Sequence, residues 1–273
     1  MKKVVLFFLL LFCLGLTRAQ IIELGGMAGG SFYMGDLNPT PQFSLMKPAF
    51  GFVFRYNFNT RWALTTNLIS GGLQGSDVTG QAYEGRNLSF ESSLIEINTH
   101  LELNFLEYFT GSSKDGFSPY LFGGLGMFIF NPKAELNGQL VELQPLKTEG
   151  QDTKAYPDRK PYSTVSVSFP FGIGVKYSLG KKVCVGAEWG LRKTLSDYID
   201  DVSTTYYLDG TTIDPANPAQ ILSDPGMDHQ PDMQRGNSQN NDWYSIAGIF
   251  LTYRFSLYKT PTCNQFNRVQ KIN

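Results

Sequence analysis

The two histidines of the chain are the first side chains to consider for chemistry. His100 lies close in sequence to Glu96 and Glu102, and an imidazole paired with a carboxylate can act as a general acid or base. In an extended segment, side chains two residues apart point to the same face, so these groups share one face. We interpret His100 as a packed, hydrogen-bonded residue of a polar interior rather than a catalytic group.

His229 lies in a polar segment with several aspartates nearby. Together with Met227 and Met233 it could bind copper, a metal that accepts soft ligands. The clustered carboxylates of the same segment could instead hold calcium. Neither spacing matches an established metal motif, so we interpret the segment as a solvated loop and predict no metal and no cofactor.

Residues 1–19 have the layout of a secretory signal peptide. Lys2 and Lys3 precede an apolar stretch at 4–16, and Ala19 supplies a small residue at the cleavage site. We therefore divide the chain into a signal peptide at 1–19, a folded part at 20–257 and a C-terminal tail at 258–273. The formal net charge of −1 gives no indication of nucleic-acid binding.

The elements that position these side chains follow a period of two. In residues 48–58, five aromatic side chains fall on one face: Phe50, Phe52, Phe54, Tyr56 and Phe58. The same alternation occurs at 22–32, 62–68, 93–105, 120–130, 165–177, 183–191 and 243–255. A tilted membrane-crossing strand needs about 9–11 residues with alternate side chains facing lipid. The pattern predicts an all-β fold, an eight-stranded antiparallel transmembrane β-barrel in the outer membrane.

The connections between these segments sort by length. Tight turns at 57–60 and 179–182 and a medium turn at 106–117 alternate with long polar links at 34–47, 73–87, 131–160 and 196–241. Outer-membrane barrels have short periplasmic turns and long extracellular loops. The sorting predicts this arrangement, with the N-terminus of the barrel in the periplasm.

The faces predicted to point inward carry charged groups of both signs. They are Glu23, Arg55, Glu96, His100, Glu102, Lys176, Glu188, Arg192 and Arg254. An eight-stranded barrel is only wide enough for its own side chains, and buried charges must be paired. We expect these residues to form a salt-bridged polar plug that does not conduct solutes.

Two cysteines remain after removal of the signal peptide, Cys184 and Cys263. Cys184 lies near the start of the seventh predicted strand, and Cys263 lies in the tail beyond the eighth strand. An exported protein can keep disulfides. A bond between these two residues could hold the tail at the periplasmic rim.

Short motifs in the loops resemble those of a known family. They are FYMGDLN at 32–38, FRYNFN at 54–59, FNP at 130–132, PLKTEGQ at 145–151, DYIDDVS at 197–203, LSDP at 222–225 and RGN at 235–237. In order and spacing they resemble the Bacteroidetes DUF6089 family of outer-membrane barrels, which includes PorG of the type IX secretion system.

The resemblance implies a barrel in contact with outer-membrane lipids that anchors a periplasmic ring. That ring consists of a lipoprotein of the PorK or GldK kind and a partner of the PorN or GldN kind. Two alternatives stay open, a surface adhesin or resistance barrel that uses its long loops, and an outer-membrane enzyme. An enzyme of the protease or lipid-modifying kind needs a Ser/His or Asp/His set at the extracellular rim, and only His229 is expected there.

Overall fold

The computed structural model describes residues 21–39, 43, 45–80 and 85–256. The predicted signal peptide, the C-terminal tail and Cys263 lie outside the described residues, so the proposed disulfide stays a prediction. Among the residues described, none of the helices is long and apolar enough to cross a membrane.

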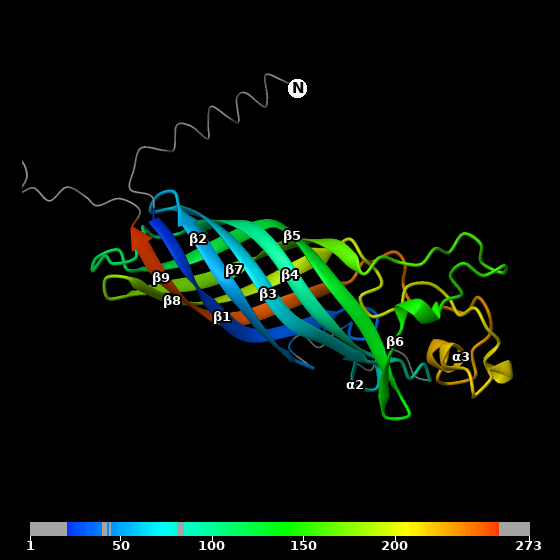
Figure 1. Cartoon of the computed structure of the whole chain (residues 1–273). Coiled ribbons are helices and arrows are strands. Elements are labelled where there is room, and N and C mark those ends of the chain that lie inside the picture. The colour runs from blue at the N-terminus through cyan, green and yellow to red at the C-terminus, as the bar shows by residue number, and fades with distance from the viewer. Residues whose placement is uncertain (1–20, 40–42, 44, 81–84, 257–273) are drawn as a thin grey trace, which may run out of the picture.

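Eight antiparallel strands close into a barrel (Figure 1). They are β1 (Ile21–Met34), β2 (Lys47–Asn57), β3 (Trp62–Ser76), β4 (Ser89–Asn104), β5 (Phe117–Leu136), β7 (Val165–Leu179), β8 (Val183–Thr194) and β9 (Trp243–Ser256). Each strand pairs with its neighbour along the chain, and β1 also pairs with β9. This last pairing closes the sheet, so the predicted eight-stranded barrel is confirmed.

The sequence predicts a polar loop for the third long link, and the structure adds a hairpin to it. β5 runs on to Leu136 and turns back as β6 (Gln139–Glu142), so a hairpin projects from the barrel. Its turn is Asn137-Gly138, and both residues have positive φ angles, of 52° and 79°. Asn-Gly favours this turn because both residues tolerate the left-handed conformation.

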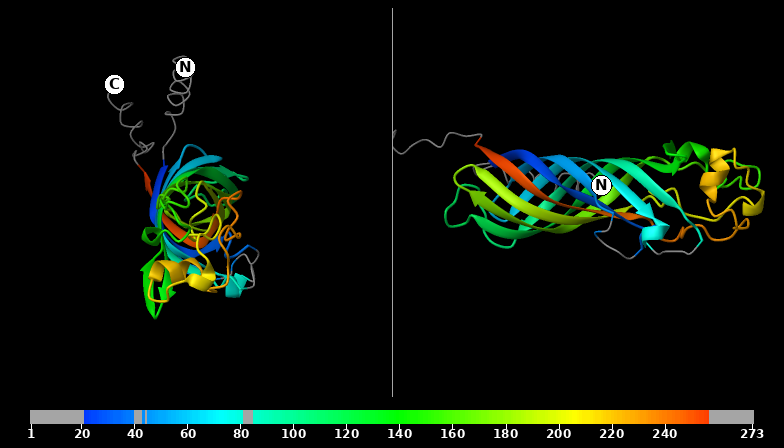
Figure 2. Two further views of the ribbon diagram at one scale, coloured as in Figure 1. Left: turned by 90° about the vertical axis from the view of Figure 1, so that its right-hand side faces the viewer. Right: turned by 90° about the horizontal axis from the view of Figure 1, so that it is seen from below.

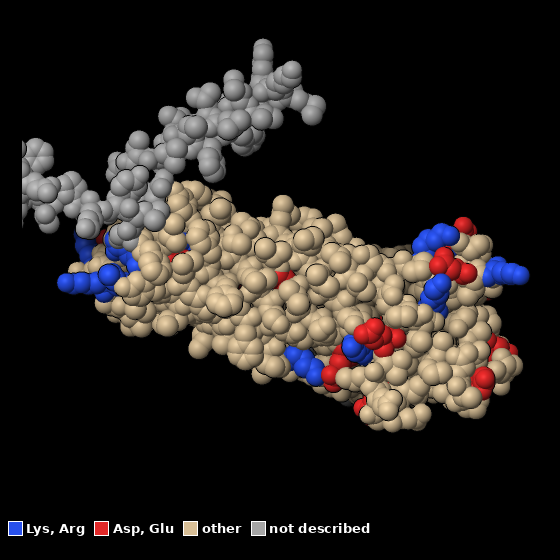
Figure 3. Space-filling view, in the orientation of Figure 1, with Lys and Arg blue, Asp and Glu red and all other residues tan. Residues whose placement is uncertain are grey.

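The alternation of side chains separates an apolar outer wall from a polar interior. Along β4 exposed and buried residues alternate without interruption from Ser89 to Leu101. Ile95 and Ile97 point outward, whereas Glu96 and Asn98 are buried. In the face seen in Figure 3, Lys, Arg, Asp and Glu gather at the two ends, and the middle of the wall is almost free of them.

The two ends of the barrel differ in structure. We call the end that holds Ile21, Ser256 and the short turns the turn end, and the opposite end the loop end. At the loop end, four short helices lie among the long connections: α2 (Asp77–Gly80), η1 (Gln144–Leu146), η2 (Gly210–Thr212) and α3 (Pro218–Ser223). Figure 2 shows these connections gathered together over the loop end, a unit that we call the loop cap.

Candidate functional site

Four of the predicted inward-facing charges form one buried cluster, which we call the interior cluster: Glu23, Arg55, Glu102 and Lys176. The register of β1 and β2 sets Glu23 opposite Arg55. The Arg55 guanidinium lies 3.0 Å from Glu23 Oε2 and 2.9 Å from Glu102 Oε1. Lys176 Nζ lies 2.6 Å from Glu102 Oε2. The two carboxylates and two cations therefore neutralise one another inside the barrel.

Neutral side chains complete the shell around Glu23. Thr252 donates a hydrogen bond of 2.8 Å to its Oε2, and Asn57 donates one of 3.1 Å to its Oε1. Thr110 also donates to Oε1. A buried carboxylate is tolerated only when its lone pairs are satisfied in this way. The cluster thus fills the barrel near the turn end with bonded groups.

A second pair lies nearer the loop end. Arg192 Nε is 3.4 Å from Glu96 Oε2, and Arg192 also donates to the Gly190 carbonyl at 2.6 Å. The hydroxyl of Tyr244 and the amide of Asn98 both donate to Glu96. All four side chains are buried. The interior therefore contains two charge-balanced layers rather than an open channel.

His100 lies between these two layers. Its Nδ1 is 3.1 Å from Asn98 Oδ1, its Nε2 is 3.7 Å from Glu102 Oε1, and its ring packs on Phe122. The side chain is fully buried. No substrate outside the barrel could reach it, which is consistent with a packing role.

The two remaining predicted residues lie apart from these layers. Glu188 is half-buried and accepts a hydrogen bond of 2.7 Å from Tyr120, and it makes no ion pair within the described part of the chain. Arg254 stands opposite Glu23 in the β1–β9 ladder, but its guanidinium donates to the Thr110 carbonyl and covers the Phe109 ring. Arg254 therefore belongs to the turn end rather than to the ion-paired layers.

The medium turn between β4 and β5 closes the turn end. Tyr108 and Thr110 are buried, and Thr110 reaches Glu23 inside the barrel. The backbone N–H of Tyr108 donates to Thr60 at 3.0 Å, and that of Gly111 donates to Ser178 Oγ at 2.7 Å. An apolar pocket of about 590 Å³ lies beside this turn, lined by Ile21, 57–60 and 108–110. Sequence reasoning missed this closure because the turn has no period-two pattern.

The loop cap is built around a buried ion pair of its own. Arg235 Nη1 lies 3.1 Å from Glu149 Oε1 and donates to the Asp201 carbonyl at 2.6 Å. Glu149 also accepts hydrogen bonds from the backbone N–H of Ser203 and the hydroxyl of Thr204. Burial raises the pKa of Asp201 to about 6, although the Arg235 charge opposes the shift. The third and fourth long loops are thus locked together.

The first and second loops join the same unit. Asp36 accepts a hydrogen bond of 2.8 Å from the Asn237 N–H. Arg86 pairs with Asp77 and donates to the carbonyls of Asp36 and Arg235. The loop motifs at 32–38, 145–151, 197–203 and 235–237 therefore meet in one place, although they are far apart in sequence.

Two buried carboxyl groups share one tyrosine where the cap meets the barrel. Tyr33 Oη lies 2.5 Å from Asp200 Oδ2 and 2.8 Å from Asp242 Oδ1. A phenol hydroxyl has a single proton to donate, so both contacts are hydrogen bonds only if one carboxyl is protonated. Burial raises the pKa of both aspartates well above the ordinary range; the charge of Asp36 adds to the shift at Asp200, and the charge of Asp200 adds to the shift at Asp242. The two carboxyl groups and the tyrosine thus form one hydrogen-bonded group between the cap and the barrel.

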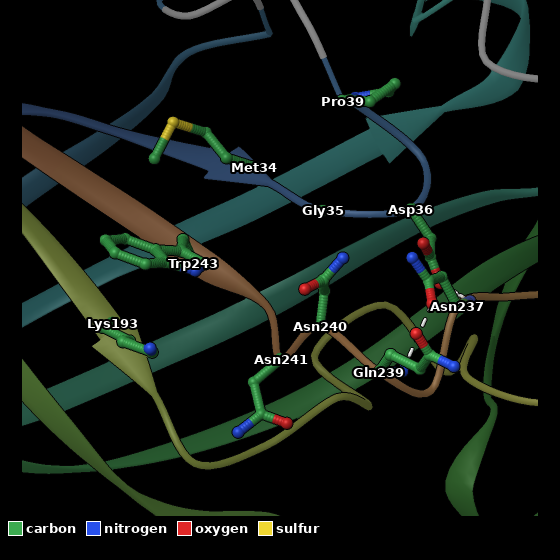
Figure 4. Close-up of a pocket in the computed structure, with 10 residues that line it drawn as sticks. All are labelled: Met34, Gly35, Asp36, Pro39, Lys193, Asn237, Gln239, Asn240, Asn241 and Trp243. Carbon is green, nitrogen blue, oxygen red and sulfur yellow. Dashed lines mark hydrogen bonds between the residues drawn. The ribbon is translucent and has the colours of Figure 1, made fainter.

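A polar cleft of about 730 Å³ opens at the edge of the cap (Figure 4). Trp243 and Lys193 lie on its barrel side, with Lys193 Nζ 5.6 Å from the centre of the Trp243 ring. The side chains of Asn237, Gln239, Asn240 and Asn241 line the rest, beside Met34, Gly35, Asp36 and Pro39. Amide and indole groups in one cleft can hold a polar ligand by hydrogen bonds and stacking.

The segment around His229 is largely exposed, as predicted for a solvated loop, but His229 itself packs inward. Its side chain is only 16% exposed, its Nδ1 lies 2.8 Å from Asp224 Oδ1, and its ring stacks on Tyr206. The predicted partners Met227 and Met233 are 41% and 48% exposed. The neighbours of the imidazole are two carboxylates rather than the two expected thioethers, because Asp228 Oδ1 also lies 3.1 Å from His229 Nδ1.

A family model described as a domain of unknown function, DUF6089, matches residues 2–207. The chain belongs to the DUF6089 family. The matched residues include five of the seven loop motifs but not the LSDP and RGN motifs of the fourth loop. No curated protein matches the DUF6089 chain.

Several solved barrels resemble the structure loosely. Ail of Yersinia pestis, solved with a heparin analogue, is 11% identical, with a TM-score of 0.42 over 87% of this chain and 100% of its own. OprG of Pseudomonas aeruginosa is 11% identical, with a TM-score of 0.39 over 88% and 97%. Neisserial surface protein A is 10% identical, with a TM-score of 0.38 over 87% and 98%. These scores are too low to bear on function.

Proposed function

We propose that this DUF6089 protein is a non-enzymatic outer-membrane barrel that anchors a periplasmic ring complex of the type IX secretion machinery. The partners would be a lipoprotein of the PorK or GldK kind and a protein of the PorN or GldN kind, as for PorG of the Bacteroidetes. The observation that carries the proposal is the filled interior, since a plugged barrel can hold a complex but not pass cargo.

The strand lengths and the apolar outer wall favour a location in a membrane. Its strands have 11 to 20 residues, against the about 9–11 that a tilted membrane-crossing strand needs. Phe50 and Phe52 on β2 are 62% and 74% exposed, which would be costly in water but is favourable in lipid. Outer-membrane barrels keep short turns in the periplasm, so the turn end faces the ring proteins and the loop cap faces outward.

The interior supports anchoring over transport. The interior cluster and the Glu96–Arg192 pair occupy successive layers, and Tyr108 and Thr110 close the turn end. Opening a path would separate buried charges, which costs about 3–5 kcal/mol for each broken pair. The same contacts make the barrel rigid, as an anchor requires.

The turn end offers a basic surface to a partner. The exposed cations there are Arg61, Lys114, Lys181 and Lys182. They surround a turn that is fixed by hydrogen bonds to Thr60 and Ser178. Complementary charges steer association and fix orientation. A ring subunit with an acidic face would fit this surface.

Crosslinking in cells tests the orientation and the partner together. A photo-crosslinking residue at Lys114 or Lys182 is expected to trap the two ring proteins. The same residue at Asp158, an exposed position of the third loop, serves as the matched control and is expected to trap neither. In a deletion strain, secretion of type IX cargo is expected to stop. Normal secretion in that strain, or equal trapping from Asp158, would refute the proposal.

One observation favours a second candidate, surface recognition by the folded loop cap. The cleft of Figure 4 presents amide groups and Trp243 toward the outside. If this role is the main one, Trp243→Ala and Asn240→Ala together abolish a surface phenotype such as adhesion while cargo secretion continues. The enzyme alternative finds an Asp/His pair in Asp224 and His229, 2.8 Å apart, but it has less support, because no serine hydroxyl within the described residues is hydrogen-bonded to His229.

A further inference from the structure

We propose that Asp224, Asp228 and His229 bind one divalent transition-metal ion of the zinc class. The three side chains lie in the fourth loop, just after α3. One ligand atom from each lies within 4.8 Å of the others. His229 Nδ1 is 2.8 Å from Asp224 Oδ1 and 3.1 Å from Asp228 Oδ1. The inference does not depend on the proposed role in secretion.

The distances suit an ion at the centre of the group. Zinc binds imidazole nitrogen and carboxylate oxygen at about 2.0–2.2 Å in a tetrahedron, so neighbouring ligand atoms lie about 3.3–3.5 Å apart. The observed distances of 2.8 and 3.1 Å require the atoms to separate by only a few tenths of an ångström. The three residues supply three ligands, and water can supply the fourth.

The surrounding contacts fix the imidazole in place. Its ring stacks on Tyr206 with the centroids 4.2 Å apart and an interplanar angle of 11°. The His229 N–H donates to Asp224 Oδ2 at 3.1 Å, and the His229 carbonyl accepts from Gly210 at 2.7 Å. Such supporting contacts orient metal ligands and limit the entropy lost on binding. Nδ1 is therefore directed at the carboxylates before any ion arrives.

The charge balance also favours a cation. Asp224 is 1% exposed, and among the described residues its ion-pair partner is His229. The carboxylates of Asp224 and Asp228 together carry more negative charge than the single imidazole between them can balance. A divalent ion supplies the missing positive charge. Asp228, whose side chain is 66% exposed, keeps the site accessible from solvent.

The free space beside the carboxylates comes from a glycine. A Cβ atom at Gly226 would lie 2.9 Å from Asp228 Oδ1 and 3.4 Å from Asp224 Oδ1. A larger residue would therefore crowd the oxygens that face the ion. The donor set also selects the metal, because imidazole with carboxylate suits zinc, whereas calcium takes oxygen ligands alone.

Calorimetry on the full-length, detergent-solubilised protein tests the site. After treatment with a chelator, titration with zinc chloride at pH 7.5 is expected to show one ion per chain, with no saturable binding of calcium. His229→Ala is expected to abolish zinc binding, and Asp228→Asn to weaken it at least tenfold. Asp158→Asn removes an exposed carboxylate from another loop and is expected to leave the affinity unchanged.

Gel mobility before and after heating checks that each variant is folded. Asp228→Asn keeps the test valid if His229→Ala fails to fold, because the Asp228 side chain is mostly exposed. X-ray absorption of the zinc-loaded protein is expected to show an imidazole nitrogen and oxygen ligands. The proposal is overturned if zinc shows no saturable binding at this stoichiometry, or if folded Asp228→Asn and His229→Ala bind zinc like the unchanged protein.

Discussion

Replacing Arg55 by Met should destabilise the barrel strongly. Methionine fills much of the same volume but cannot pair with Glu23 at 3.0 Å or Glu102 at 2.9 Å. Glu102 keeps its contact with Lys176, so the unpaired charge falls mainly on Glu23. Removing one partner of a buried pair costs about 3–5 kcal/mol, and we expect a loss of this size for Arg55→Met.

A second substitution distinguishes loss of charge pairing from loss of packing. Glu23→Gln removes the unpaired charge, and its amide can keep hydrogen bonds with hydroxyl groups such as that of Thr252. Coupling energies between contacting residues are about 0.5–3 kcal/mol, so Glu23→Gln should recover stability of this order in the Arg55→Met background. Arg254→Met is the matched control, because this arginine makes no ion pair within the described residues.

Urea unfolding in lipid vesicles, followed by tryptophan fluorescence, measures these free energies. Arg254→Met should lower the free energy of unfolding by about 1 kcal/mol, the contribution of an ordinary hydrogen bond. If Arg55→Met and Arg254→Met lower the free energy of unfolding equally, the interior charges do not depend on one another for stability. A double variant no more stable than Arg55→Met alone would lead to the same conclusion.

Three further predictions concern the interior and the loop cap. In planar bilayers the purified protein should show no large, stable conductance, and a porin-sized open level would contradict the filled interior. Arg235→Ala removes the partner of Glu149, so trypsin should cut faster at Lys147 and Arg159. The heat-dependent gel shift of the barrel should be kept. An unchanged cleavage rate would show that the Arg235–Glu149 pair does not hold the third and fourth loops together. Burial raises the pKa of Asp197 from 3.8 to about 7, so its protonated form stabilises the cap fully below pH 4 and this contribution is lost as the pH rises through about 7. Hydrogen-exchange protection of residues 197–203, taken relative to the intrinsic exchange rate at each pH, should therefore be greater at pH 5 than at pH 8, and Asp197→Asn should reduce the difference; an equal pH dependence of protection in that variant would refute this role.

The barrel could be predicted because its signal is local. In β2 the outward row from Phe50 to Tyr56 follows directly from the period of two, and the inward position of Arg55 follows with it. The set of inward charges could therefore be named from the sequence. Their pairing could not, because Lys176 meets Glu102 across the interior from 74 residues away.

The loop cap gave no comparable signal. Glu149 and Arg235 are separated by 86 residues, and nothing periodic relates them. The packing of His229 could not be predicted for the same reason, since its burial depends on Tyr206 from another part of the loop. The hairpin at Asn137-Gly138 is different, because its turn sequence is a local signal that could have been recognised.

The closure of β1 on β9 has a consequence for how the barrel is assembled. The ladder sets Glu23 opposite Arg254 and beside Thr252, so the first strand finds its partners only when the last strand has been made. A slip of one residue along this seam would turn Glu23 toward lipid and an apolar neighbour inward. The interior charges thus favour the correct strand register, because a barrel closed out of register leaves an unpaired charge in the membrane.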